Sequence, residues 1–292
     1  MTPNIHHVAS ESSLISGVLI LVSLVYLRGW LRLRRHDHNL EGWRAGSFLF
    51  GLLFIWIATA SPLAVLDHEM LTAHMVQHLL LMTLAPPLIL LGIPPGPLGD
   101  NWSRRFSKSI GRPTQSEPMQ RLRGVVTHPA FCWLAAAGAL ILWHIPSVFM
   151  LGMRSQTWHG IEQASFLAAG LLFWLPVVEP RVSKWPESSI ILYLFLATLP
   201  CDILSGFLVF CDRVVYPVFL SSHHPFGQSA LEDQQCAGAV MWTCVTLVYL
   251  IAAAVFTARL LSPHRFDESS MPQCEPHTVA ALHAESKRIE AL

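Results

Sequence analysis

Residues 70–92 have the sequence MLTAHMVQHLLLMTLAPPLILLG, and this stretch decides the class of fold. It contains no Asp, Glu, Lys or Arg, and it is longer than the roughly 20 apolar residues that a helix needs to cross a membrane. Six further segments are long and apolar in the same way: 12–33, 43–62, 130–150, 158–178, 188–210 and 235–261. The sequence therefore predicts an all-α, polytopic membrane helical bundle with seven transmembrane helices.

The composition of the whole chain agrees with a membrane protein. Of its 292 residues, 52% are hydrophobic and 13% are charged, whereas an ordinary soluble domain has about 25% charged residues. The mean hydropathy is +0.45. Six cysteines are scattered along the chain without a CxxC pair, so no compact cysteine metal site or disulfide framework is expected.

The distribution of basic residues predicts how the helices are oriented. Of the 19 Lys and Arg residues, 17 fall in the loops after the first, third and fifth segments and after the seventh, and only Arg154 and Arg213 fall on the other side. Basic loops stay in the cytoplasm, so the N-terminus is predicted outside and the C-terminus inside. Residues 1–261 are then a transmembrane domain, and residues 262–292 are a polar cytoplasmic tail.

Once each helix has a direction, its polar residues can be placed by depth. Histidines and acids from several different helices fall near the outer face: His74, His78, His144, His159, Glu162, Asp202 and Asp233, with His68 in an outer loop. The spacing of two pairs is informative, because His74 and His78 are four residues apart and His159 and Glu162 are three apart. Residues at these spacings share one face of a helix.

These side chains predict a metal site without fixing the metal. Imidazole with thioether suits copper, and imidazole with carboxylate suits zinc or iron. A single histidine at a helix end is more often an interfacial residue, and Asp202 could be a polar packing group. The pair His74 and His78 is the best supported, since ionisable residues within a span are costly and usually functional. The methionines at 70, 75, 82 and 241 are expected to be ordinary packing residues.

Several blocks of the sequence together resemble a known family, the CtaG-type cytochrome c oxidase assembly factors. The blocks occur in order over about residues 50–260: SPL at 61–63, HMVQHLL at 74–80, APPL at 85–88, LGIP at 91–94, WHIP at 143–146, His159 with Glu162 and Phe166, DQQ at 233–235, and Ala237-Gly238 with Met241-Trp242. Ordered blocks of this kind are much more specific than any one of them.

The resemblance implies a multi-pass protein of the bacterial inner membrane that is needed to make an active heme-copper oxidase. It implies copper handling on the periplasmic side rather than enzymatic activity. The matched positions are His74, His78, His144, His159, Glu162 and Asp233, with the acids as ligands or as groups that orient an imidazole; His68 and Asp202 are the less certain candidates. The expected partners are oxidase subunits, periplasmic copper chaperones and membrane lipid, with no nucleic acid.

Three other functions remain open from the residues alone. A membrane heme protein would use two of the same histidines on facing helices, and a purified sample without a Soret band would eliminate it. A metalloenzyme could use His159, Glu162 and Asp233, although no nucleophile or substrate motif accompanies them. A copper permease would need a polar stripe through the cytoplasmic halves of the helices, and no such stripe is seen. Zinc, iron and heme therefore stay as alternatives to copper.

Overall fold

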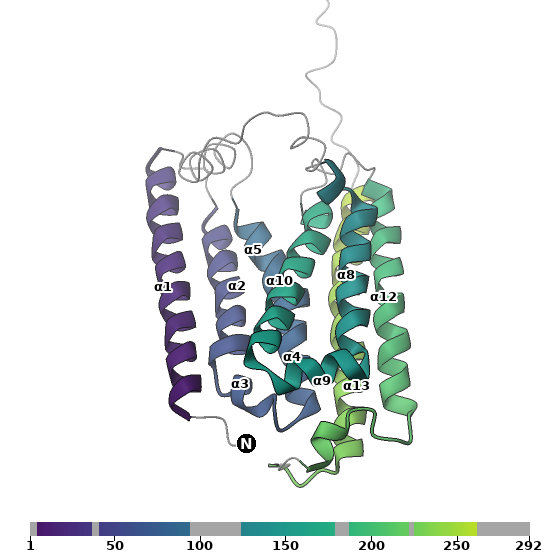
Figure 1. Ribbon diagram of the computed structural model, residues 1–292. Helices are drawn as coiled ribbons and strands as arrows, with labels where there is room; N and C mark the ends of the chain where they lie inside the picture. Colours follow the sequence, from purple (N-terminus) through teal and green to yellow (C-terminus); the bar gives the residue numbers. More distant parts are fainter. Residues whose placement is uncertain (1–4, 37–40, 94–123, 179–186, 222–224, 262–292) are drawn as a thin grey trace, which may run out of the picture. The chain divides into compact units, whose positions relative to one another are not determined.

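The computed structural model describes residues 5–36, 41–93, 124–178, 187–221 and 225–261, and within these ranges it contains helices and connections but no strand (Figure 1). Residues up to Thr257 form one compact unit. The predicted tail, 262–292, lies outside the described residues. The elements are α1 Ile5–His36, α2 Gly42–Ala60, α3 Leu63–Leu66, α4 Leu71–Leu79, η1 Leu80–Leu84, α5 Ala85–Gly92, α8 Pro129–His144, α9 Pro146–Arg154, α10 Gln156–Val178, α12 Glu187–Phe210, η2 Pro217–Ser221 and α13 Ala230–Leu261.

Six stretches of the described chain are long and apolar enough to cross a membrane: Ser12–Arg35, Gly42–Leu66, Leu71–Gly92, Gln156–Val178, Ser189–Phe210 and Ala230–Ala258. The bent pair formed by α8 and α9 becomes a seventh span if it is counted as one. These stretches match the predicted segments closely, so the helical, membrane-spanning class is confirmed. The direction in which they cross the membrane stays a prediction.

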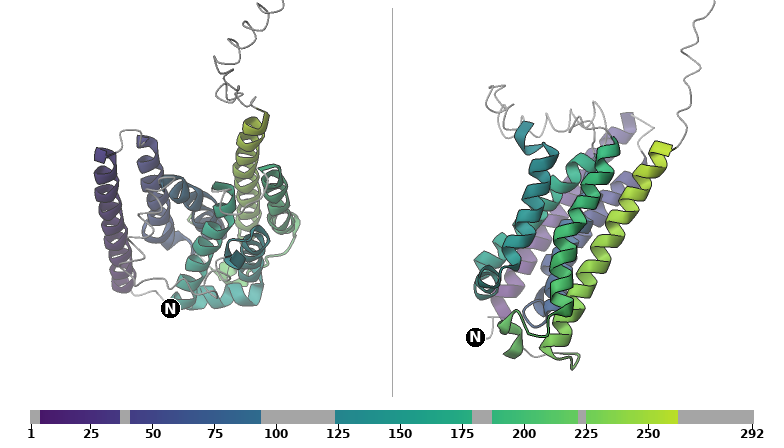
Figure 2. Two further views of the ribbon diagram at one scale, coloured as in Figure 1. Left: turned by 90° about the horizontal axis from the view of Figure 1, so that it is seen from above. Right: turned by 90° about the vertical axis from the view of Figure 1, so that its right-hand side faces the viewer.

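The span Leu71–Gly92, which comprises α4, η1 and α5, is the most enclosed of the six. In its most apolar window 56% of the residues are buried, compared with 11% for the span within α1. Figures 1 and 2 place α1 and α2 on one side of it and α12 and α13 on the other. Helix α1 instead exposes large apolar side chains such as Leu14, Val18 and Leu21, as a lipid-facing helix does.

The paired prolines of the central span are accommodated by a wider helical turn. Pro86 and Pro87 lack the N–H groups that would bond to the carbonyls of the preceding turn. The segment Leu80–Leu84 is a π-helix, in which the Ala85 N–H donates to the Leu80 carbonyl five residues earlier. Helix α10 approaches this turn closely at Gly170, where an added Cβ would lie 2.6 Å from the Met82 carbonyl oxygen. Such wide turns are frequent at functional sites.

The predicted span 130–150 is not one straight helix. It breaks between His144 and Pro146, and α8 and α9 are bent by 76° to each other. A residue before proline avoids the helical conformation, and Ile145 accordingly has extended backbone angles of φ −65° and ψ 123°. The break frees the His144 carbonyl, which accepts a hydrogen bond of 3.0 Å from the Tyr216 hydroxyl. Helix α9 therefore runs across one end of the bundle, near α3 (Figure 1).

Candidate metal centre

Helix α4 presents two histidines to the interior of the bundle. His74 is fully buried and His78 is 6% exposed, and their ring centroids lie 4.3 Å apart. Aromatic rings pack against both: Phe149 against His74 at 4.9 Å and Phe166 against His78 at 4.1 Å. The predicted pairing on one helix face is therefore present, and the pair is held in an apolar setting.

Helix α10 brings His159 and Glu162 to the same point. The Glu162 Oε1 atom lies 3.4 Å from the Nε2 atoms of both His74 and His78. Its Oε2 atom lies 3.5 Å from Nδ1 of His159. Glu162 is only 1% exposed, so one buried carboxylate faces three imidazoles.

The facing atoms of this group make no hydrogen bonds within the described structure. Both ring nitrogens of His74 and His78, Nδ1 of His159 and both oxygens of Glu162 are buried without a hydrogen-bond partner. Buried polar atoms are nearly always satisfied, because each unmade bond costs about 1–3 kcal/mol. Donor atoms of His74, His78 and Glu162 all lie within 4.8 Å of one another, close enough to share one ion. A bound cation would satisfy one nitrogen of each ring together with an oxygen of Glu162.

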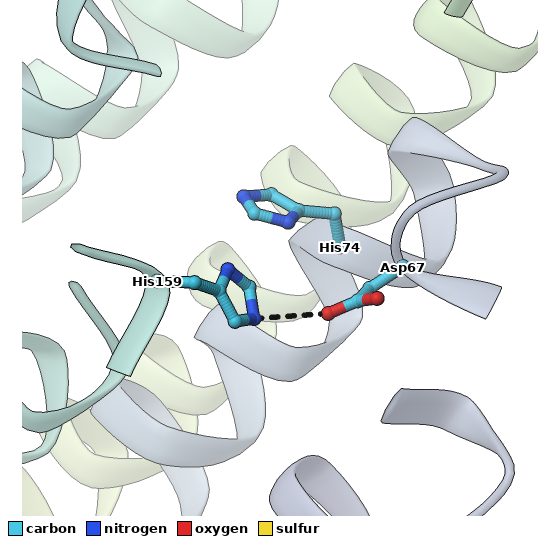
Figure 3. A group of neighbouring side chains, drawn as sticks. All are labelled: Asp67, His74 and His159. Carbon is cyan, nitrogen blue, oxygen red and sulfur yellow. Dashed lines mark ion pairs between the residues drawn. The ribbon is translucent and has the colours of Figure 1, made fainter. Parts of the chain in front are cut away.

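Asp67, in the connection between α3 and α4, pairs with the Nε2 atom of His159. Its Oδ2 atom lies 3.0 Å from His159 Nε2 (Figure 3), and its side chain is 1% exposed. Burial alone would raise the pKa of Asp67, but the hydrogen bond from His159 and the positive charge of nearby histidines lower it below its ordinary value. The Gln163 amide nitrogen lies 2.8 Å from the same Nε2 atom, so two groups hold this side of the ring and the Nδ1 atom faces Glu162.

The prediction named His68 and missed its neighbour Asp67. The His68 side chain is 38% exposed, with Nε2 3.8 Å from Asp67 Oδ1, so it lies at the rim of the group. Burial lowers the pKa of His68 below its ordinary value, although the Asp67 carboxylate opposes this effect. The sequence placed Asp67 in the same loop, but only the fold shows which of the two side chains turns inward.

His144 lies one step away from the group. Its ring centroid is 6.3 Å from that of His78, and its Nε2 atom faces the Met75 sulfur at 3.3 Å. It is 5% exposed and belongs to neither of the two clusters with converging ligand atoms among the described residues, which are His74–His78–Glu162 and Asp67–His74–His159. His144 is therefore a neighbour of the group rather than part of it.

Asp233 of α13 caps the helix that carries the two histidines. Its carboxylate accepts hydrogen bonds from the Leu71 N–H at 2.6 Å, the Thr72 N–H at 3.2 Å and the Thr72 hydroxyl at 2.7 Å. Helix α4 has no side-chain cap of its own, because Met70 occupies the position before it. A carboxylate satisfies the free N–H groups of a first turn and is attracted by the helix dipole. Asp233 thus positions α4.

Asp202 lies apart from all of these residues. It sits on α12 at intermediate burial, and its Oδ1 atom has no hydrogen-bond partner among the described residues. Of the eight predicted metal residues, the structure brings four together, namely His74, His78, His159 and Glu162. It places His68 at the rim, His144 beside the group, Asp233 at a helix cap and Asp202 elsewhere.

The tight packing of these histidines does not favour the heme alternative. The cavity that His78 and His144 both line measures about 40 Å³, and the larger space of about 1130 Å³ that His144 also lines, between α8 and α12, has no second histidine among the described residues in its wall. A drug-sized ligand needs a pocket of about 300–1,000 Å³, and a porphyrin is no smaller. A single ion is the kind of ligand that this site can hold.

Gly152 of α9 gives the first test of the geometry. A Cβ atom at this position would lie 2.7 Å from Glu162 Oε2, closer than real contacts allow. We expect Gly152→Ala to displace the carboxylate and to weaken the binding of Zn²⁺ or Cu²⁺ about 10-fold, measured by equilibrium dialysis of the purified protein. Gly160→Ala is the matched control, because a Cβ there meets nothing within 4 Å. Equal affinities for the two variants would contradict this geometry.

Comparisons with known proteins agree with this architecture. The model of the cytochrome c oxidase caa3 assembly factor family (Caa3_CtaG) matches residues 24–262. An uncharacterized protein of Mycobacterium leprae (strain TN) is 22% identical over 259 residues, which are 85% of this chain and 38% of that protein. An uncharacterized protein of Mycobacterium tuberculosis (strain CDC 1551 / Oshkosh) is 22% identical over 256 residues, 84% of this chain and 38% of that protein. This chain spans about two fifths of the length of these curated relatives. No solved structure gives a significant match.

Proposed function

Because the chain belongs to the cytochrome c oxidase caa3 assembly factor family, we propose that it helps to assemble a heme-copper oxidase by binding copper at its buried histidine cluster. This cluster, defined as His74, His78, His159 and Glu162, is called the carboxylate site below. Copper is the cargo in this proposal. The protein would hold the ion and release it to the oxidase rather than use it for catalysis.

One observation carries the proposal. Three imidazoles and one carboxylate converge inside an apolar bundle, and their facing atoms have no hydrogen-bond partner among the described residues. Imidazole nitrogen with carboxylate oxygen is a donor set that suits Cu²⁺, as well as zinc and iron. Buried ionisable groups are costly unless they are paired or bind a metal. An assembly factor for a copper-containing oxidase needs a place to hold copper, and the described residues offer this one.

The position of the site within the bundle supports a periplasmic location. The carboxylate site lies near α3 and α9, at the same end as the start of α1 (Figure 1). The basic run of Arg28, Arg32, Arg34 and Arg35 falls in the last turns of α1, at the opposite end. Basic ends face the cytoplasm. In a bacterial inner membrane the ion would then be exchanged with oxidase subunits, or with copper chaperones, on the periplasmic side.

Metal analysis of detergent-purified protein tests the proposal directly. The wild type is expected to bind about one Cu²⁺ per chain at the carboxylate site, because the ligand atoms of His74, His78 and Glu162 lie within 4.8 Å of one another. His74→Ala combined with His78→Ala removes two donors and is expected to abolish this binding. The same double variant is expected to fail to restore oxidase activity in cells that lack the chromosomal copy.

His128→Asn is the matched control for the loss of a histidine. His128 is exposed and its ring accepts a hydrogen bond from the Ala130 N–H at the start of α8, a role that asparagine can keep. This variant should bind copper and restore the oxidase like the wild type. Restored oxidase activity in the double variant, or wild-type protein that binds no copper, would rule out the carboxylate site as the place where copper is held.

A further inference from the structure

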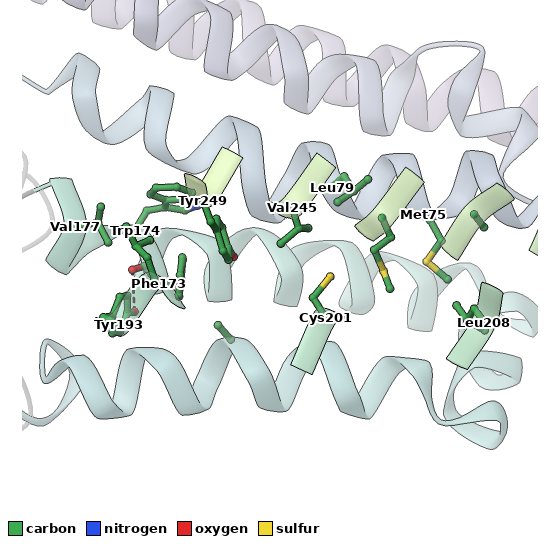
Figure 4. Packing of buried hydrophobic residues seen from close by; sticks show 14 of the residues in the cluster. Met75, Leu79, Phe173, Trp174, Val177, Tyr193, Cys201, Leu208, Val245 and Tyr249 are labelled. Atoms are coloured by element: carbon green, nitrogen blue, oxygen red, sulfur yellow. Dashed lines mark hydrogen bonds between the residues drawn. The ribbon is translucent and has the colours of Figure 1, made fainter. Parts of the chain in front are cut away.

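A small cavity next to the carboxylate site has four sulfur-bearing side chains in its wall. Its volume is about 40 Å³, enough for one ion or one water molecule. It lies between α4, η1, α8, α10, α12 and α13, and its mostly apolar wall contains four sulfur-bearing and two imidazole side chains: Met75, Met82, Cys201, Met241, His78 and His144. Figure 4 shows Met75 and Cys201 extending into the same part of the core. Thioether and thiol sulfur are weak hydrogen-bond partners but good ligands for soft metals.

The His144 ring is oriented in the cavity wall as the ring of a metal-binding histidine usually is. Its Nδ1 atom lies 2.7 Å from the Leu140 carbonyl oxygen. A carbonyl oxygen can only accept, so Nδ1 carries the proton and Nε2 of the neutral ring keeps its lone pair. Histidines that bind metals almost always donate their other N–H in this way, often to a backbone carbonyl. His144 is the histidine of this region whose ring is oriented by the backbone.

The Nε2 lone pair of His144 faces the Met75 sulfur, which carries no proton. The Nε2 atom lies 3.3 Å from the Met75 sulfur, and a thioether can only accept. Two acceptors facing each other gain nothing from a hydrogen bond. In tetrahedral zinc sites the nitrogen and sulfur ligands lie about 2.0–2.1 Å and about 2.3 Å from the ion, and bonds of similar length allow donors 3.3 Å apart to share an ion.

We propose that His144 and Met75 form a second metal site, selective for Cu⁺, in the cavity that Met82, Met241 and Cys201 complete. Sulfur ligands with one imidazole select monovalent copper, whereas the carboxylate site suits a divalent ion. His78 lines this cavity and also faces Glu162, so the two sites share a wall. The inference rests on the proposed copper function and adds to it the oxidation state and a sulfur-based ligand set.

This assignment changes the role expected for the methionines. Met75 is 1% exposed and Met241 is 3% exposed, which would suit ordinary core packing. Packing alone, however, requires no sulfur at these positions, because leucine has nearly the same volume. Met75→Leu therefore separates the two roles: it preserves the packing and removes the sulfur ligand.

Binding of Cu⁺ to the full-length, detergent-purified protein under anaerobic conditions provides the test. Affinity is measured by competition with a Cu⁺ chelator, and the ligands are identified by X-ray absorption at the copper edge. Wild type and Glu162→Gln are expected to show sulfur in the copper coordination shell. Met75→Leu is expected to lose this sulfur signal in part and to bind Cu⁺ at least about 10-fold more weakly.

Two further variants keep the result interpretable. Met153→Leu removes a thioether that packs against the core outside the cavity, so it should bind Cu⁺ like the wild type. Met241→Leu removes another sulfur from the cavity and gives a second reading should Met75→Leu not fold. A wild-type copper shell of nitrogen and oxygen alone, or equal Cu⁺ affinity in all of these methionine variants, overturns the sulfur site.

The failure of this inference can be told apart from the failure of the proposed function. If copper binding depends on Glu162 and shows no sulfur, the carboxylate site stands and the sulfur site falls. If the wild type binds neither Cu⁺ nor Cu²⁺, both fall together.

Discussion

Asp233→Ala is expected to lower the free energy of unfolding by about 2–6 kcal/mol, because two buried N–H groups lose their acceptor at about 1–3 kcal/mol each. Asp233 is fully buried and accepts three hydrogen bonds from the first turn of α4. Without the carboxylate, the Leu71 and Thr72 N–H groups stay buried and unsatisfied. In a thermal melt of detergent-purified protein the midpoint should fall by about 10 °C. Because α4 carries His74 and His78, copper binding should weaken in the same variant.

Two further substitutions serve as comparisons for Asp233→Ala. Asp233→Asn keeps one carbonyl oxygen and should lose less stability than Asp233→Ala. Asp212→Ala removes an exposed aspartate and should leave the midpoint within about 1–2 °C of the wild type, because surface substitutions rarely exceed ±0.5 kcal/mol. A melt of Asp233→Ala that matches Asp212→Ala would show that the cap does not hold α4 in place.

The role of Asp233 marks where prediction from the sequence reached its limit. The spans, and the pair His74 and His78, could be predicted because the pattern lies within a single stretch of sequence such as 70–92. A cap that comes from another helix is not local: Asp233 and Leu71 are 162 residues apart along the chain. The predicted depth in the membrane was the same for Asp233 and the histidines. Depth alone cannot distinguish a metal ligand from a residue that supports the ligands.

The same limit explains Asp67 and Met75. Asp67 is adjacent to His68 in the sequence, and nothing in the spacing says which of two adjacent side chains turns inward. Met75 was expected to be a packing residue, since a thioether in an apolar helix needs no other explanation. Its sulfur lies beside His144, the last residue of α8, which is 69 residues away along the chain. Tertiary contacts decided each of these cases.

Glu162→Gln is expected to weaken Cu²⁺ binding by about 100-fold or more, at least as much as the loss of a group that only supports a metal ligand. The substitution keeps the shape of the side chain and removes its charge. Glu162 faces the Nε2 atoms of His74 and His78 at 3.4 Å, so its charge offsets that of an ion placed between them. A glutamine there would present an amide to the same space and attract a cation far less. Isothermal titration with Cu²⁺ in a buffer of known copper affinity measures the change.

The comparison that makes Glu162→Gln decisive is Glu41→Gln. Glu41 is exposed before α2, where it pairs with Arg44 at 3.5 Å, and its loss should leave copper binding unchanged. Protein that elutes as one sharp peak in gel filtration excludes a folding defect in either variant. If Glu162→Gln binds Cu²⁺ as tightly as Glu41→Gln, the buried carboxylate has a purely structural role. The histidines would then have to hold the ion without it, and the divalent character assigned to this site would be lost.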